Sequence, residues 1–301
     1  MKRILTLKTV VTATLMALTL GACESDETWN HGYFNLSTVL DAYFSEYGAF
    51  GTDEGTTTGW FDRNYPYADN RDYNDFMSAV SKNILTLDEV ETAYINQYGD
   101  FGTDKNTSRQ WFKNSYNYVN DDDFNYFWNY FMGYVLESRR QMALYLNGFW
   151  KGSMTMNYKD SGGRPVQLPC NVTWDFELNG KTGVSGRGQE VRTSAEGVVT
   201  TNFSWQVNDM GGIEMSFDPA GGTSDPVNML VEYGNLDKLD GSVFIGTSVG
   251  VNIDETDDFN LVKGSYAKGT RTVGGKVFGG KNKKIGTRSV VRNITKSGGH
   301  R

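Results

Sequence analysis

A seven-residue phrase occurs twice in this chain of 301 residues, and it constrains the fold more than any other feature. YGAFGTD begins at Tyr47, and YGDFGTD begins at Tyr98, 51 residues later. Residues 36–85 align with residues 87–136 at this constant shift without a gap, and many matched positions carry the same aromatic or aliphatic residue. A repeat period near 50 residues with such identities indicates a duplicated structural unit.

Each unit has the pattern of a helical hairpin. Apolar residues of the first copy follow one face of an α-helix over residues 36–47, and the second copy keeps that face over residues 87–98. The glycine that follows, Gly48 or Gly99, suits the left-handed position at a helix C-terminus. Because a short hairpin cannot bury its apolar face alone, we expect both copies to pack together in a helical domain over residues 34–147.

Two features of these hairpins admit a second interpretation. The loop aspartates could bind calcium, but no stretch matches the alternating-oxygen loop with its central glycine and closing glutamate. Carboxylates at helix starts satisfy free N–H groups, so we favour capping for Asp72 and for residues 121–123. The pairs Trp60-Phe61 and Trp111-Phe112 could stack on sugars, but aromatics at matched positions favour hydrophobic plugs within each hairpin.

After residue 147 the apolar pattern changes from a helical period to an alternating one. Residues 172–178, 199–207 and 213–217 alternate apolar with polar side chains, and glycine-bearing turns separate them. About eight short strands with one apolar face indicate an antiparallel barrel or sandwich over residues 148–264. The expected fold class is α+β and multidomain, with an N-terminal all-α tandem helical-hairpin repeat followed by an antiparallel β-barrel.

The strand region resembles the lipocalin superfamily, and it is most similar to the lipocalin-like (calycin-like) domains of Bacteroidetes lipoproteins. The resemblance covers about residues 147–264. It rests on Gly148-Phe149-Trp150, Ser185-Gly186-Arg187-Gly188, the strand Phe203–Val207 with its partner Ile213–Met215, and Phe259-Asn260-Leu261. It implies a barrel whose floor is crossed by Trp150 as a fold residue. The arginine that covers this tryptophan in lipocalins has no clear counterpart in the sequence.

The interior of such a barrel is the first candidate binding site. Eight strands enclose a space that side chains fill or that holds one small ligand, and such a ligand would be mainly apolar. The candidate ligand contacts are four aromatic residues at inward-facing positions, Trp174, Phe176, Phe203 and Trp205. The alternative is that these four residues form plain core.

Residues 1–22 have the pattern of a lipoprotein signal peptide. Basic residues precede an apolar run that is too short to span a bilayer, and the run ends in Leu20-Gly21-Ala22-Cys23. This ending resembles the lipobox of bacterial lipoproteins, which implies cleavage before Cys23 and a membrane anchor of fatty-acyl chains such as palmitate on that residue. The acids at the start of the linker 23–33 resemble surface-export signals of Bacteroidetes lipoproteins. We therefore expect a lipid-anchored outer-membrane protein that faces the cell exterior, and a plain acidic spacer is the alternative.

Catalytic motifs are absent from the sequence. Its two histidines, His31 and His300, lie outside both predicted domains, which argues against Ser-His-Asp, Cys-His and zinc sites within them. Asp175 and Glu177 share one side of a strand and could serve a glycosidase, but chance pairs are common among 36 acidic residues. We expect a non-enzymatic protein with no catalytic residues, no metal and no cofactor.

The last segment of the chain, residues 265–301, has the opposite charge from the rest. It holds ten Lys and Arg residues and no Asp or Glu, whereas residues 23–264 hold 16 basic and 36 acidic residues, a formal net charge of −20. We expect a disordered, glycine-rich tail that binds a polyanion such as lipopolysaccharide, an acidic glycan or DNA. Its alternatives are a tail docked on the acidic body and a solvated tail. The candidate contacts are Lys276, Lys281, Lys283, Lys284, Arg288 and Arg292.

Together these features favour a surface-anchored binding protein without enzymatic activity. It would attach to the membrane through the lipid on Cys23 and hold a small apolar ligand in its barrel. The alternative is a structural or adhesive cell-surface protein with a solid barrel and a polyanion-binding tail.

Overall fold

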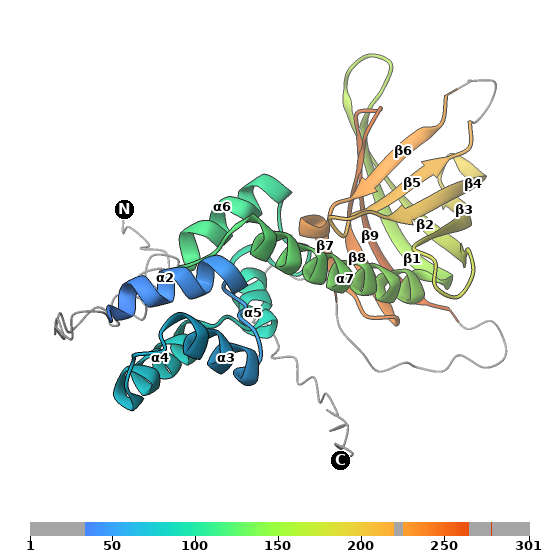
Figure 1. Cartoon of the computed structure of the whole chain (residues 1–301). Coiled ribbons are helices and arrows are strands. Elements are labelled where there is room, and N and C mark those ends of the chain that lie inside the picture. Colours follow the sequence, from blue (N-terminus) through green and yellow to red (C-terminus); the bar gives the residue numbers. More distant parts are fainter. Residues whose placement is uncertain (1–33, 220–224, 265–277, 279–301) are drawn as a thin grey trace, which may run out of the picture. The chain divides into compact units, whose positions relative to one another are not determined.

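The computed structural model describes residues 34–219, 225–264 and 278, and Figure 1 shows their elements. In these ranges six α-helices precede an antiparallel β-sheet, so the α+β class and the order of its parts are confirmed. The predicted signal peptide, Cys23, the acidic linker and the six candidate cations of the tail lie outside the described residues.

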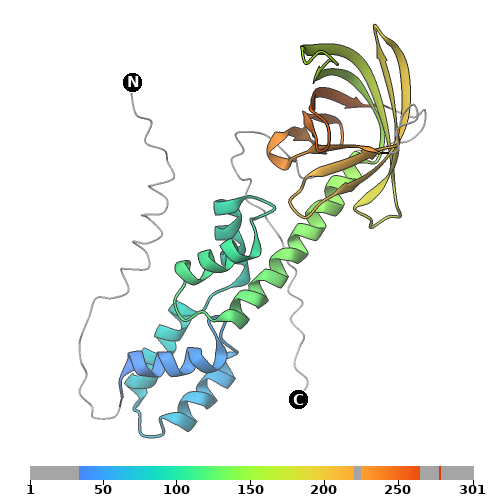
Figure 2. The ribbon, with the colours of Figure 1, turned by 90° about the horizontal axis from the view of Figure 1, so that it is seen from above.

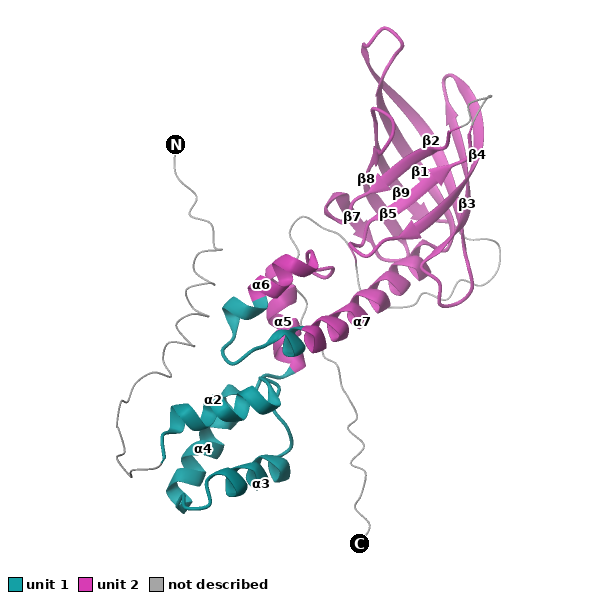
Figure 3. Cartoon of the chain, turned by 45° about the horizontal axis from the view of Figure 1, so that its top comes forward, with its two compact units in different colours: residues 1–86, 112–124 teal, residues 87–111, 125–301 magenta. Residues whose placement is uncertain are grey.

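The chain divides into two compact units, coloured separately in Figure 3. One comprises residues 1–86 and 112–124, and the other comprises residues 87–111 and 125–301. The predicted domain boundary at residue 148 is the point where helices give way to strands. The division of the chain into a helical domain and a barrel domain at this point stays a prediction.

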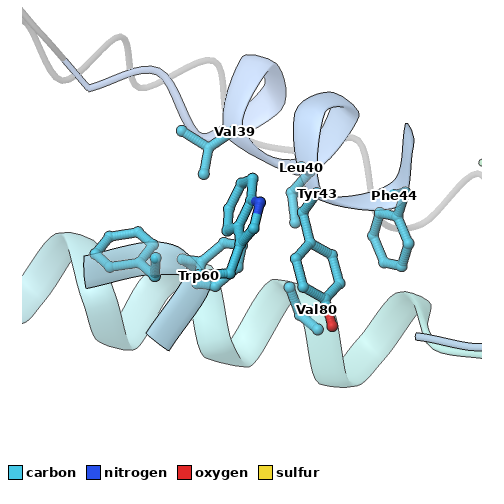
Figure 4. Close-up of a cluster of buried hydrophobic side chains, with 8 residues drawn as sticks. Val39, Leu40, Tyr43, Phe44, Trp60 and Val80 are labelled. Carbon is cyan, nitrogen blue, oxygen red and sulfur yellow. The ribbon is translucent and has the colours of Figure 1, made fainter. Parts of the chain in front are cut away.

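The first unit contains α2 (Leu36–Tyr47), α3 (Glu54–Asn64) and α4 (Asn70–Asn83). Figure 4 shows their shared apolar cluster, which buries Val39, Leu40, Tyr43, Phe44, Trp60, Phe61, Phe76 and Val80. The Tyr43 hydroxyl lies 2.8 Å from the Thr57 hydroxyl, so a buried polar group is satisfied inside the cluster. Trp60 and Phe61 therefore plug this cluster, as expected. They lie on α3, however, where the sequence predicted a loop between two helices, so the unit has three helices and the prediction of a two-helix hairpin is wrong.

Aspartates cap the helices of the first unit. Asp53 accepts a hydrogen bond from the Thr56 amide at the start of α3. Asp69 and Asp72 form a capping box at the start of α4, in which each side chain accepts from the other residue's amide. These bonds satisfy N–H groups that an α-helix leaves unpaired, which confirms the capping interpretation for these aspartates.

The remaining helices are α5 (Leu87–Tyr98), α6 (Lys105–Ser115) and α7 (Asp121–Leu146). α5 and α6 begin and end 51 residues after α2 and α3, and α7 begins 51 residues after α4. Contacts recur at the same shift. The hydroxyls of Tyr94 and Ser108 lie 2.5 Å apart, and Asn120 and Asp123 form the same pair of hydrogen bonds as Asp69 and Asp72.

The turns that carry the duplicated phrase make different contacts. In the first unit the Ala49 amide donates to Asp123 Oδ1 over 3.1 Å. In the second unit Asp100 accepts from the hydroxyls of Tyr134 and Tyr233 at 2.8 and 2.9 Å. Gly48 and Gly99 have φ values of 71° and 84°, so both turns use the left-handed conformation that glycine adopts without strain.

The sheet contains nine antiparallel strands. They are β1 (Gly148–Lys159), β2 (Pro165–Leu178), β3 (Ser185–Ser194), β4 (Gly197–Val207), β5 (Ile213–Phe217), β6 (Val227–Val231), β7 (Leu236–Leu239), β8 (Val243–Gly250) and β9 (Glu255–Lys263). Figure 2 shows them curling around a common interior.

The sheet closes because β6 and β7 pair with the same edge of β8. Met229 of β6 lies opposite Gly250, and Leu236 of β7 lies opposite Gly246, while the other edge of β8 pairs with β9. A 3₁₀ turn, Tyr233–Asn235, separates β6 from β7, so the two form one interrupted strand. The result is an eight-stranded antiparallel barrel, the architecture that the resemblance to lipocalins implied.

The C-terminal end of α7 lies against one end of the barrel, the end that contains Trp150 and Lys263. We call this the closed end, and the half of the interior next to it the closed half. Trp150 Nε1 donates to the Leu146 carbonyl over 2.6 Å. Lys263 Nζ donates to the Tyr145 carbonyl over 2.7 Å and lies 4.9 Å from the centre of the Trp150 ring. A lysine from the last strand thus covers this tryptophan, which the sequence did not identify because only closure brings β9 beside β1. Burial lowers the pKa of Lys263 to about 8.

Phe278 is the one described residue of the predicted tail. Its amide and carbonyl exchange two hydrogen bonds with Leu239, at 2.9 and 2.8 Å. Its buried ring lies edge-on to Tyr145, with the ring centres 5.9 Å apart. This position of the tail is therefore attached to β7 at the closed end of the barrel.

Candidate functional site

Aromatic rings pack the closed half of the barrel interior. They are Trp150, Trp174, Phe176, Phe203, Trp205, Phe244 and Phe259, all at most 3% exposed. Edge-to-face contacts join them, with ring centres 5.2 Å apart both for Trp174 with Phe259 and for Phe176 with Phe203. Such contacts add to the stability that apolar burial provides.

Two glycines of the motif Ser185-Gly186-Arg187-Gly188 allow this packing. A Cβ atom on Gly188 would lie 2.3 Å from the Phe203 ring, and one on Gly186 would lie 2.7 Å from Trp205 Nε1. Only glycine lets the rings of β4 approach the backbone of β3 so closely. The motif therefore contributes to the floor of the barrel.

All four predicted ligand contacts lie in this packed half. Trp174 and Phe176 are 1% exposed, and Phe203 and Trp205 are 2% and 3% exposed. Their packing matches the alternative of plain core. Their role as ligand contacts stays a prediction, and this burial does not favour it.

A cavity of about 240 Å³ lies in the other half of the barrel. Strands β1–β4 and β9 and the β3–β4 hairpin supply its walls: Met156, Tyr158, Leu168, Cys170, Arg192, Ser194, Glu196, Gly197, Val199 and Glu255. None of the four predicted aromatic contacts belongs to this lining. In Figure 1 the β1–β2 hairpin, which joins the strand ends that form the walls, lies at the end of the barrel away from α7. We call this half the mouth.

Charged side chains point into the barrel at the inner end of the mouth. Side chains alternate along a strand, so Glu190 shares the interior face of β3 with Arg192, and Asp257 shares that of β9 with Glu255. Glu190 and Asp257 are only 4% and 5% exposed. Pairing places Asp257 between Met156 of β1 and Ser248 of β8, directly beside the cavity wall.

Hydrogen bonds satisfy Glu190 completely. Arg192 Nε lies 2.8 Å from Glu190 Oε1, and Trp174 Nε1 donates to Glu190 Oε2 over 2.7 Å. Arg192 also directs Nη1 at the sulfur of Met156, 3.0 Å away. The guanidinium is thus held between a buried carboxylate and the cavity wall.

Asp257 is less well satisfied. Its Oδ2 accepts from the Ser248 hydroxyl over 3.3 Å, its buried Oδ1 has no donor among the described residues, and its carboxyl group also forms a hydrogen bond with that of Glu255. Burial raises the pKa of Asp257 to about 8, and the carboxylates of Glu255 and Glu190 add to the rise while Arg192 opposes it. The group therefore holds its proton at neutral pH.

The neighbouring ionisable groups shift in the same direction. Burial raises the pKa of Glu190 and of Glu255, and Arg192 again acts against the rise. Burial also raises the pKa of the Cys170 thiol, so this cysteine stays protonated and unreactive at neutral pH. The mouth is thus a partly apolar space with an excess of carboxyl groups at its inner end.

Sequence reasoning missed this cluster. The signal was present in β9, where Glu255 and Asp257 occupy the same alternating face as Phe259 and Leu261. Carboxylates in register with core residues predict buried acids. The pair that was singled out, Asp175 with Glu177, lies instead beside a polar hollow of about 560 Å³, together with Arg187, Gln189 and Asn202.

No family model matches the sequence, and the search of curated proteins found no match. Within residues 34–219, 225–264 and 278, no helix has the length and apolar character needed to cross a membrane. The same residues contain no group of three or more His, Cys, Asp or Glu side chains arranged to hold a metal ion.

Proposed function

We propose that this protein binds a small molecule in the mouth of its barrel and has no enzymatic activity. The observation that carries the proposal is the cavity of about 240 Å³, open between apolar and charged walls above a packed aromatic floor. Binding pockets for drug-sized ligands measure about 300–1,000 Å³. A ligand for this cavity would therefore be small.

A cavity-filling variant tests this proposal. Leu168→Trp places an indole in the cavity, and Gln167→Trp places one on the exposed face of the same strand. The full chain is screened against a library of small molecules by thermal shift and native mass spectrometry. We expect ligands that bind the wild type and Gln167→Trp but not Leu168→Trp. Equal binding by both variants, or no ligand for any of the three proteins, contradicts a binding site in the mouth.

The proposal includes a lipid anchor on Cys23 at the outer face of the outer membrane. It is supported by the ending Leu20-Gly21-Ala22-Cys23 and by the acids that follow it. Several acyl chains on one residue hold a protein firmly, because each buried methylene contributes about 0.8 kcal/mol. Cys23→Ala should release the protein from the membrane fraction, and a variant that stays bound at high salt would have another anchor.

We further infer that the two three-helix segments, α2–α4 and α5–α7, are copies of one repeat. The inference is supported by helix bounds and hydrogen bonds that recur 51 residues apart. Tyr43→Phe and Tyr94→Phe each remove one of the recurring buried hydroxyl pairs. If the two segments are equivalent, both variants lose at least about 1 kcal/mol of unfolding free energy in urea titrations, and Tyr94→Phe loses more because the Tyr94 hydroxyl also accepts from the Thr103 amide. A loss in only one of them would contradict equivalence.

A structural or adhesive role is the second candidate. The packed closed half of the barrel favours it, and so do the ten Lys and Arg residues of residues 265–301, a segment without Asp or Glu. Truncation after residue 280 removes most of these cations but keeps Phe278 and its bonds to Leu239. An adhesive tail predicts that the truncated protein loses binding to heparin, DNA and lipopolysaccharide at low salt with an unchanged Tm. An intact protein that ignores all three polymers overturns this role.

A further inference from the structure

We propose that the ligand of the mouth is a small amphipathic amine, whose ammonium group binds Asp257 and Glu255 and whose apolar part contacts Met156, Leu168 and Val199. The inference rests on the proposed function, since it requires that the cavity binds a small molecule. It adds the chemical class of that molecule and the residues that select it.

The charges at the inner end of the mouth do not balance. Three carboxyl groups, those of Glu190, Glu255 and Asp257, point into the barrel there. Arg192 is the one described cation that acts on all three. Its Nε is held by Glu190, whose second oxygen is bound by the Trp174 indole. Glu255 and Asp257 are therefore left without a cation of their own.

Asp257 Oδ1 is the group that points to a ligand. It belongs to a residue that is 5% exposed, and no N–H or other cationic donor in the described part of the chain reaches it; besides Ser248, Asp257 forms a hydrogen bond there only with the carboxyl group of Glu255, with which it can share a proton. A buried polar atom without a partner costs about 1–3 kcal/mol, and more when the group is charged. A bound donor that carries a positive charge would supply the missing hydrogen bond and would also neutralise the carboxylate. An ammonium group supplies three N–H donors and one positive charge.

The walls of the cavity define the rest of the ligand. Pairing places Asp257 opposite Met156, and Glu255 lies opposite Tyr158 one layer closer to the opening. Leu168 and Val199 line the same space with apolar side chains. An amine that enters ammonium-first would therefore bury a short alkyl or aromatic group between these residues.

The groups that face Asp257 decide how binding depends on protons. They are Glu255 on its own strand, Ser248 on β8, Glu190 and Arg192 on β3, and the Cys170 thiol on β2. Asp257 holds a proton at pH 7 in the empty protein because its pKa is about 8. An ammonium group favours the ionised carboxylate, so binding at pH 7 should release a proton.

The test compares three probes of the same length on the full chain at pH 7. Isothermal titration calorimetry measures hexylamine, 1-hexanol and hexanoate. We expect hexylamine to bind at least tenfold more tightly than 1-hexanol, and hexanoate to bind most weakly. Titrations in buffers with different ionisation enthalpies should show release of up to one proton per amine bound.

Two charge-removing variants locate the binding group. Asp257→Asn and Glu255→Gln should each weaken hexylamine at least tenfold and leave 1-hexanol within threefold of the wild type. Asp258→Asn is the matched control, because Asp258 is the next residue of β9 and lies on its exposed face. If Asp257→Asn does not fold, Glu255→Gln and the proton release still test the proposal.

Each negative result of these binding experiments has a different meaning. Equal affinities for the amine and the alcohol overturn the ammonium site but leave a binding mouth in place. Tighter binding of hexanoate also overturns it, because Arg192 would then be the anchor. Displacement of hexylamine by micromolar Ca²⁺ overturns it in favour of a metal site. If none of the probes binds and the Leu168→Trp comparison also finds no ligand, the proposed function itself fails.

Discussion

In the closed half of the barrel, aromatic rings fill the interior, whereas in the mouth the same strands direct carboxyl groups and a guanidinium inward. β3 shows the change within one strand: Gly186 and Gly188 make room for rings, and Glu190 and Arg192 follow on the same face. The floor gains stability from apolar burial. The mouth buries ionisable groups, which costs stability, and buried ionisable groups with shifted pKa values cluster at functional sites.

Loss of a floor ring should have the largest effect on stability. Trp174→Ala removes a fully buried indole and leaves Glu190 Oε2 without its donor, so we expect a loss of about 3–5 kcal/mol in urea unfolding. Leu168→Ala in the mouth should cost about 1 kcal/mol or less, because Leu168 is half-buried beside an existing cavity. Equal losses would break the comparison between the two halves.

Removal of Arg192, the one cation that lines the mouth among the described residues, should have the next largest effect. Arg192→Gln leaves Glu190, 4% exposed, without its charged partner, and we expect a loss of about 2–3 kcal/mol at pH 8. Arg164→Gln is the control, since Arg164 pairs with Asp160 at the surface and should cost at most about 1 kcal/mol. A small effect of Arg192→Gln would mean that the mouth carboxyls are neutral even at pH 8.

The pH dependence of stability should report Asp257. Folding raises the pKa of this group from 3.8 to about 8, so the folded state binds more protons than the unfolded state between these values. Stability from this group is complete below about pH 4 and falls as the pH rises to about 8.

Asp257→Asn should flatten this decline and be more stable than the wild type at pH 8, by about 1–2 kcal/mol. Asp258→Asn, from the exposed face, should keep the slope of the wild type. Chemical unfolding at pH 5, 6.5 and 8 measures the difference. A variant that is less stable than the wild type at pH 8 would show that Asp257 is ionised and well paired.

Lys263, at the floor of the barrel, should make stability change with pH in the opposite direction and by a smaller amount. Its pKa falls from 10.5 to about 8 on folding, so the folded state binds fewer protons in this window and stability rises from pH 8 to 10.5. Lys263→Met should lack this rise, and we expect a difference of about 1 kcal/mol or less, since Nζ keeps its bond to Tyr145. The quantity to measure is the stability difference from the wild type at pH 8 and 10. A difference that does not change over this range would place the charge of Lys263 in solvent.

Particular residues show how far sequence reasoning reached. Apolar periods predicted the first and last helices of each repeat and most of the strands, because each period is local. They did not predict α3 and α6, which the hairpin pattern places in loops. The strand count needed the structure, since β6 and β7 appear separate until both pair with β8. The sequence predicts the binding site among the aromatic residues of the floor, where packing leaves little room, and does not predict the charged residues of the mouth.

Although it did not predict α3 and α6, the sequence by itself determined the first helix of each repeat, the change of period after residue 147, and the likeness of the two repeats. These properties depend on neighbours within a few residues, whose spacing is visible in the chain. Only the tertiary structure decided that Ser248 bonds to Asp257 and that Glu190 lies near enough for its charge to act on Asp257. These residues lie on three strands far apart in sequence, and their meeting depends on the register and closure of the barrel, which set the layer that each inward side chain occupies.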